Sequence, residues 1–144
     1  MKNILNLIFR KWKKNKIYFN ELRDLLSVDI EQICKDVLDI DEAVRFSMIV
    51  KDGVKKFGGY RYNTVGILDS DELDQSIWHA NERMVGRKMA EHKLGKTRYA
   101  MAEYERVKRI TFPLENKTLL LVSVDIDSDH NKIIKNILKM LEQI

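Results

Sequence analysis

The stretch TLLLVSV, residues 118–124, is apolar at both odd and even positions. A strand with this pattern is buried on both faces, so we predict a central strand that helices cover, at least in part, on each side. Residues 107–114 alternate instead, with Ile110 and Phe112 on one face. The sequence Glu-Asn-Lys at 115–117 favours a turn between the two runs. Together they predict two neighbouring antiparallel strands in a sheet.

Alternation and turn residues predict three further strands. Residues 44–51 alternate between apolar and polar, and the pair Asp52-Gly53 favours a tight turn because both residues tolerate positive φ. Residues 54–60 return as the partner strand, and Gly58-Gly59 near its end predicts a bulge or a close backbone approach. With residues 98–104 as a fifth strand, we expect the order 2-1-5-4-3, counted along the chain.

A helix is predicted before the first strand. Its buried stripe has apolar residues at helical spacing: Ile30, Ile33, Cys34, Val37 and Leu38. Asn20 is a candidate N-cap, and Ser27 either caps a new turn or lies inside a longer helix. We interpret Cys34 as a small buried hydrophobe rather than a reactive thiol, because no histidine stands beside it in the sequence.

Two more helices are predicted further along the chain. Asp69 and Glu72 are spaced as a capping box, and the helix that they begin is expected to run to about Leu94, where Gly95 ends it. Its apolar face comprises Leu73, Ile77, Ala80, Met84 and Met89. The last helix is expected to be capped by Asp127 or Ser128. Its apolar stripe, the clearest in the sequence, comprises Ile133, Ile134, Ile137, Leu138, Leu141 and Ile144.

The element order is therefore α-ββ-α-βββ-α, an α+β fold with a five-stranded, mostly antiparallel sheet. We expect the middle helix on one face of the sheet and the other helices on the opposite face. The chain of 144 residues is long enough for one domain and can bury enough surface to fold without disulfides or structural metals. A single cysteine excludes an internal disulfide, and no apolar run is long enough to span a membrane, so we expect a cytoplasmic protein.

The charge is concentrated at the N-terminus. Residues 1–20 hold six Lys and Arg residues and no acid, whereas residues 21–144 hold 20 positive and 22 negative side chains. We divide the chain into a basic amphipathic helix at 1–20, here called the arm, and a single domain at 21–144. The apolar sector of the arm contains Ile4, Leu5, Ile8, Phe9 and Trp12, and Lys11, Lys13 and Lys14 surround Trp12.

Three roles are open to the arm. It packs on its own domain or mediates oligomerisation, it binds a groove on a partner, or it lies on an anionic membrane. We favour the first, because a freely displayed apolar face is an aggregation liability.

The middle helix supplies further candidates for an interaction surface. Gly86 lies in its interior, which predicts a close contact with another backbone, such as a helix crossing in a homodimer. Arg83 and Arg87 flank this glycine. The strand at 98–104 is expected at the edge of the sheet, where strands tend to be paired or covered. Self-association is therefore predicted.

Five short segments carry a resemblance to known proteins: residues 44–46, 58–59, 94–95, 104–110 and 119–123. Through them the chain resembles a set of small proteins of ammonia-oxidising archaea. In element order and lengths over 28–144, with a glycine-bearing hairpin before the middle helix, it also resembles the roadblock family of the profilin-like and longin-like group. The roadblock resemblance implies dimers and partner binding, often with small GTPases or motor assemblies, and no catalysis. The arm departs from a minimal roadblock domain.

Candidate metal ligands have simpler interpretations. Asp125, Asp127 and Asp129 follow the central strand, but the Gly and Glu of a calcium-binding loop are missing, and helix capping accounts for the acids. His79 and Glu82 lie one helical turn apart without a second such pair, which favours a solvated helix face. No catalytic or phosphate-binding motif is present, so we expect no enzyme activity, no metal and no cofactor.

Two groups of side chains suggest binding instead. Arg45, Arg83, Arg87 and Arg98 would form an anion site if the middle helix crossed the first strand, and the alternative is local ion pairing such as Arg87 with Glu91. A second group suggests RNA stacking on strand aromatics, although tyrosine is also common in strands for packing reasons. It comprises Tyr60, Arg61, Tyr62, Tyr99 and Tyr104.

The sequence favours a non-catalytic regulatory or scaffold module that acts through dimerisation and protein binding. The alternatives are a protein that associates with RNA or an anionic membrane through the arm, and a small-ligand sensor. The partner is not encoded in any motif.

Overall fold

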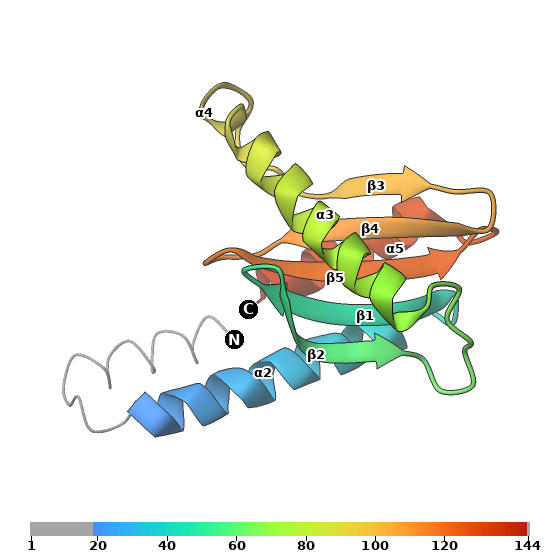
Figure 1. Ribbon diagram of the computed structural model, residues 1–144, viewed down its shortest axis with the longest axis horizontal. Helices are drawn as coiled ribbons and strands as arrows, with labels where there is room; N and C mark the ends of the chain where they lie inside the picture. The colour runs from blue at the N-terminus through green and yellow to red at the C-terminus, as the bar shows by residue number, and fades with distance from the viewer. Residues whose placement is uncertain (1–18, 144) are drawn as a thin grey trace.

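A computed structural model describes the backbone of residues 19–143 and the side chains of residues 29–143. The chain forms an α+β fold with one antiparallel sheet of five strands in the order β2-β1-β5-β4-β3 (Figure 1). This confirms the predicted strand order. The elements along the chain are α2 (Phe19–Ile40), β1 (Val44–Lys51), β2 (Val54–Tyr60), α3 (Ser70–Lys88), α4 (Glu91–Leu94), β3 (Ala100–Glu103), β4 (Val107–Pro113), β5 (Thr118–Asp125) and α5 (His130–Glu142).

The helices divide between the two faces of the sheet as predicted, with α3 across one face and α2 and α5 on the other (Figure 1). Under α3, the side chains of Ile77, Ala80 and Met84 pack on β1 and β5. The opposite core is larger and contains Phe112 and Ile133, neither of which is exposed to solvent. Apolar burial on both faces is the main force that stabilises such a layered fold.

The central pair of strands is β1 and β5. Leu119 to Val122 are all buried, as the two-sided apolar pattern predicts. Burial of β1 is more complete than its alternation predicts, since Ser47 and Ile49 are buried as well. The reason is tertiary: these two side chains lie on the face that α2 covers, so that both faces of β1 are inside the protein.

Both predicted turns use positive φ. The Asp52-Gly53 turn has φ of 52° and 76°, and Asn116 and Lys117 have φ of 57° and 56°. The left-handed region suits the right-handed twist of hairpin strands and is tolerated best by Gly, Asn and Asp.

Gly58 confirms the close approach predicted for the glycine pair. Its φ is 121°, and a Cβ there would lie 2.2 Å from the carbonyl oxygen of Ser47. Gly59 differs, because no described residue beyond its chain neighbours lies within 4 Å of the Cβ position there. The antiparallel pairing of β1 with β2 also has a register shift between Ile49 and Val50.

Three helix boundaries differ from prediction. The capping box of Asp69 and Glu72 is present, but α3 ends at Lys88 and only the short α4 continues to Leu94. The C-terminal end of α3 extends past the sheet (Figure 1), and Met89 and Leu94 are exposed, whereas Met84 is the last buried residue of the helix.

The other two differences concern helix starts. The N-cap of α5 is Asp129, whose side chain accepts a hydrogen bond from the backbone N–H of Lys132, so the predictions of Asp127 and Ser128 were wrong. Asn20 and Ser27 both lie inside the continuous helix α2.

The arm lies outside the described residues, and so do its predicted site residues. These are Ile4, Ile8, Lys11, Trp12, Lys13 and Lys14. Among the residues that the structure describes, no helix is long and apolar enough to cross a membrane.

Gly58→Ala is expected to lower the free energy of unfolding by about 2–4 kcal/mol, because the new methyl group meets the β1 backbone at a φ that alanine rarely adopts. Urea unfolding measures the change, with Gly59→Ala as the matched control. That control is expected to change stability by less than about 1 kcal/mol. Equal urea midpoints for the two variants would contradict the close approach of β2 to β1.

Candidate functional site

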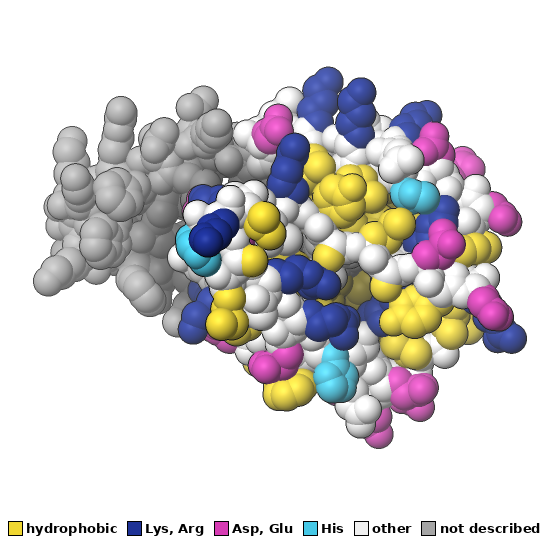
Figure 2. Space-filling view, turned by 90° about the horizontal axis from the view of Figure 1, so that it is seen from above, with side chains coloured by type: hydrophobic (Ala, Val, Ile, Leu, Met, Phe, Trp, Pro, Cys, Tyr) yellow, Lys and Arg dark blue, Asp and Glu magenta, His cyan; other side chains and the backbone are white. Residues whose placement is uncertain are grey.

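A pocket of about 490 Å³ opens on the α3 face of the sheet. Its walls come from the loop between β2 and α3, the first turn of α3, and the turn between β3 and β4. Its floor is the sheet itself. Figure 2 views the molecule from the β3 side, where Lys and Arg side chains border a hollow with hydrophobic side chains in and around it.

The strand register explains the floor of the pocket. Tyr60 pairs with Phe46, Phe46 with Ser123, and Ser123 with Arg109, so these residues form one row across four strands. The row runs from two aromatic rings, 4.9 Å apart between centroids, to a charged side chain. Ser123, between Phe46 and Arg109, has a small side chain and therefore fills little of the space above the sheet at that point. We refer to these four residues as the floor row.

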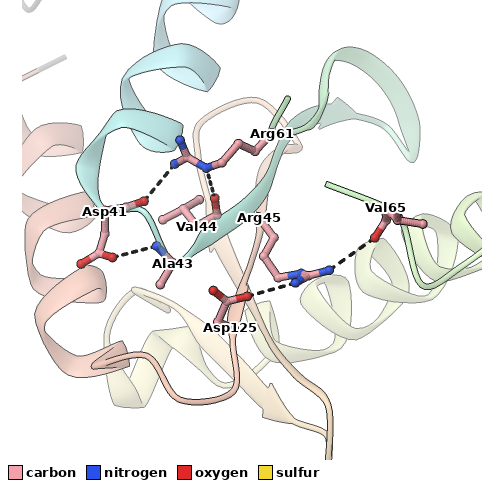
Figure 3. A network of polar contacts seen from close by, with 7 residues as sticks. All are labelled: Asp41, Ala43, Val44, Arg45, Arg61, Val65 and Asp125. Atoms are coloured by element: carbon pink, nitrogen blue, oxygen red, sulfur yellow. Dashed lines mark hydrogen bonds and ion pairs between the residues drawn. The ribbon is translucent and has the colours of Figure 1, made fainter. Parts of the chain in front are cut away.

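Arg45 enters the pocket through a break in the β1–β5 register. Val44 pairs with Val124 and Phe46 with Ser123, so Arg45 is an extra residue in the ladder. Such a bulge re-aims a side chain. The guanidinium of Arg45 donates to Asp125 Oδ1 at 3.0 Å and to the carbonyl of Val65 at 3.3 Å (Figure 3). Arg45 therefore holds the loop before α3 against the end of β5.

Two further arginines line the pocket, and sequence reasoning missed both. Arg109 is half-buried in β4 and Arg106 is exposed in the turn before it. The guanidinium groups of both residues have no hydrogen bond or ion pair with any residue in the described part of the chain. The signal was present in the sequence: Arg109 occupies a non-core position of β4 opposite Ser123, the first polar residue after the apolar run of β5.

The four arginines predicted to converge do not do so. Arg45 lines the pocket, whereas Arg98 pairs with Glu142 at 3.8 Å. Arg83 and Arg87 are exposed on α3 without an ion pair among the described residues. The expected link from Arg87 to Glu91 is absent as well. Glu91 instead accepts the backbone N–H of Thr97, and this hydrogen bond lowers the pKa of its carboxyl.

A second feature of the α3 side is a stripe of exposed apolar residues, Trp78, Val85 and Met89, here called the outer stripe. Their side chains are 56%, 55% and 80% exposed. They recur at a spacing of seven and four residues, which places them on one side of the helix, roughly a third of a turn around its axis from Ile77 and Met84. At Gly86 no atom of the described residues outside the local helix backbone lies within 4 Å of the Cβ position.

The tyrosines and Arg61 do not form one stacking surface. Tyr60 packs on Phe46, and Tyr99 lies 6.3 Å from Phe112 between ring centroids. Tyr62 is exposed in the loop after β2. Arg61 donates to the carbonyls of Leu38, Asp41 and Val44, so it joins the end of α2 to the start of β1 (Figure 3). Its guanidinium therefore stabilises the fold through hydrogen bonds to the backbone.

Two of the three acids at the end of β5 and after it, Asp125 and Asp129, make contacts within the fold. Asp125 pairs with Arg45, and Asp129 caps α5. His130 Nδ1 lies 2.9 Å from Nζ of the buried Lys108, so the two side chains share a hydrogen bond. His79 and Glu82 are exposed on α3. Within residues 29–143, no group of three or more His, Cys, Asp or Glu side chains is arranged to hold a metal ion.

Cys34 is 1% exposed in the core beneath α2, as its place on the apolar stripe predicts. Its Sγ lies 3.7 Å from the carbonyl oxygen of Phe57. Burial raises the pKa of the thiol, which disfavours the reactive thiolate.

A family of unknown function, DUF6659, matches residues 23–144. The chain belongs to DUF6659. No curated protein matches its sequence. The family membership covers every strand and α3, α4 and α5, and therefore the whole of the pocket.

Solved structures share the fold of this DUF6659 protein. The gliding protein MglB from Thermus thermophilus is 13% identical and has a TM-score of 0.61, over 78% of this chain and 84% of that one. MglB from Myxococcus xanthus is 12% identical, with a TM-score of 0.60 over 81% and 87% of the two chains. A Roadblock/LC7 domain from Streptomyces avermitilis is 15% identical, with a TM-score of 0.56 over 78% and 94%. The predicted roadblock fold is confirmed.

Arg61→Gln is expected to lower the free energy of unfolding of the DUF6659 protein by about 1–3 kcal/mol, because backbone carbonyls at the α2–β1 junction lose a charged donor. Urea unfolding is the measurement. The neighbouring Tyr62→Ala removes an exposed ring and is expected to change stability by less than about 0.5 kcal/mol. A variant at Arg61 as stable as the parent chain would show that the junction does not depend on this guanidinium.

Proposed function

We propose that this protein is a non-catalytic regulatory or scaffold module that forms a homodimer and binds another protein. The observation that carries the proposal is the outer stripe on α3, a helix whose other side is already buried against the sheet. Apolar side chains gathered on one exposed helix face are typical of protein interfaces. The roadblock-like fold supports this class of function by analogy.

The strand β3 supports self-association. It is the last strand of the sheet, is four residues long and pairs only with β4 among the described strands. An unpaired edge is a template for another strand, and a second copy of the same chain satisfies it with closed symmetry. One of the MglB structures with this fold is described as having a tetrameric arrangement.

Gly86 gives the outer stripe room for a second helix. No described residue outside the local helix backbone lies near its Cβ position, so packing within the described part of one copy does not require glycine there. Glycine destabilises a helix interior relative to alanine. Its lack of a side chain allows the backbone of a second helix to approach closely. Arg83 and Arg87 on the same helix are proposed to lie at the rim of this interface.

The arm and the remainder of the chain are proposed as separate units, a basic helix at 1–20 and one domain at 21–144. We propose that the arm packs on the domain or its dimer mate. Binding of RNA or an anionic membrane through the arm is the alternative, and its signature would be affinity that falls steeply with salt. The archaeal relationship and a cytoplasmic location are part of the same proposal.

A double variant, Trp78→Glu with Val85→Glu, is expected to convert a dimer into a monomer, because it places like charges on the outer stripes of both copies. Light scattering at tens of micromolar measures the mass. The matched control is Tyr62→Glu with Val65→Glu, which alters two residues of similar character, 89% and 83% exposed, in the loop before α3. That control is expected to stay dimeric.

Gly86→Leu provides an independent test of the same interface. It is expected to weaken the dimer while leaving the monomer folded, since no described residue outside the local helix backbone lies within 4 Å of the Cβ position. A parent chain that is monomeric under these conditions, or a Gly86→Leu variant that associates as tightly as the parent, would overturn the proposed dimer.

A further inference from the structure

We propose that the pocket on the α3 face binds a small amphipathic organic anion, with its apolar body over Phe46 and Tyr60 and its carboxylate or phosphate group at Arg106 and Arg109. This inference goes beyond the proposed function, because the pocket is formed within one copy of the chain and needs no second copy.

The dimensions and lining of the pocket fit a small molecule. Its volume of about 490 Å³ lies in the range of roughly 300–1,000 Å³ that is usual for small-molecule sites. Such sites are mostly apolar with a few polar groups that fix orientation. Here Ile67, Leu68 and Leu73 form an apolar wall above the two aromatic rings of the floor row.

The floor row gives the pocket a direction. Tyr60 and Phe46 lie at one end and Arg109 at the other, with the small Ser123 between them. On the far side of Arg109 the paired residue is Ala102, again small, so that large neighbours do not cover the guanidinium. A ligand that spans the row therefore contacts apolar surface at one end and positive charge at the other.

The charges of the lining favour an anion. The guanidinium of Arg45 is bound to Asp125 and the Val65 carbonyl, whereas the guanidinium groups of Arg106 and Arg109 have no partner within residues 29–143. Glu105 is the one carboxylate among the lining residues. A guanidinium binds carboxylate or phosphate through two parallel hydrogen bonds, and it does so more strongly where it is partly shielded from water, as at the half-buried Arg109.

Other occupants fit less well. The arm of the same chain offers six positive charges and no acid, so the arginines of the pocket would repel it. A neutral apolar ligand would cover Arg109 without giving its guanidinium a partner, and burying an unpaired charge is costly. An amphipathic anion satisfies both ends of the floor row.

The test uses the full chain and four probes that share an eight-carbon body: octanoate, octyl phosphate, octan-1-ol and octyltrimethylammonium. Calorimetry gives the affinities, and backbone amide NMR shifts locate the site. We expect saturable binding of octanoate or octyl phosphate with a Kd of roughly 0.1–1 mM. Octan-1-ol and the cation are expected to bind at least about ten-fold more weakly. The shifts are expected at Tyr104 to Arg109 and at Ser123. The tighter of the two anions identifies the head group.

Variants that remove one positive charge distinguish binding in the pocket from non-specific attraction of anions to the protein surface. Arg109→Gln and Arg106→Gln are each expected to weaken octanoate binding about five-fold or more. Arg87→Gln removes the same charge from an exposed position on α3 and is expected to leave it unchanged. Because Arg106 is exposed in a turn, its variant stays informative even if Arg109→Gln unfolds the protein, which circular dichroism would show.

Three results would overturn the proposal: octanoate and octyl phosphate that bind no more tightly than octan-1-ol, amide shifts that lie outside the pocket, or equal weakening by Arg87→Gln and Arg106→Gln. The double variant of the outer stripe is expected to bind octanoate with the affinity of the parent chain. The mass measured by light scattering in the same samples therefore separates a failure of the proposed dimer from a failure of the pocket.

Discussion

The paired strands β1 and β5 contribute side chains to both hydrophobic cores, one on each face of the sheet. From Val44 to Val50 every β1 side chain except that of Arg45 is buried, and so are Leu119 to Val122 of β5. The helix α3 covers one face of this pair, while α2 and α5 cover the other. Each helix layer therefore depends on the same two strands, and loss of either layer would expose apolar surface on the strands that support the other.

The same pairing also produces the pocket. In a regular ladder, neighbouring residues of β1 would point to opposite faces, but the extra residue Arg45 in the bulge lets it and Phe46 line the same pocket. On β5 the apolar run stops at Ser123, a small residue. Ser123 lines the pocket together with Leu73 from the first turn of α3. The pocket thus arises where the β1–β5 pair ceases to be a packed core and its register breaks.

Likeness of fold leaves the chemistry of such a site open. Structures that are 12–15% identical share the arrangement of strands and helices, and a shared backbone hosts unrelated functions. The floor row and the outer stripe on α3 are made of side chains, and likeness of backbone says nothing about side-chain chemistry.

The sequence by itself determined the order of the elements, the strand order, the central place of TLLLVSV and both positive-φ turns, because period, turn residues and two-sided apolar runs are local signals. It also determined that Cys34 is a core residue. Only the tertiary structure decided where α3 ends, that Asp129 caps α5, and that Arg45 lines one pocket with Arg106 and Arg109 rather than with Arg83, Arg87 and Arg98. The physical reason is that register across strands and the crossing of a helix over a sheet bring together residues up to 64 positions apart, as with Arg45 and Arg109, and no local pattern records such a distance.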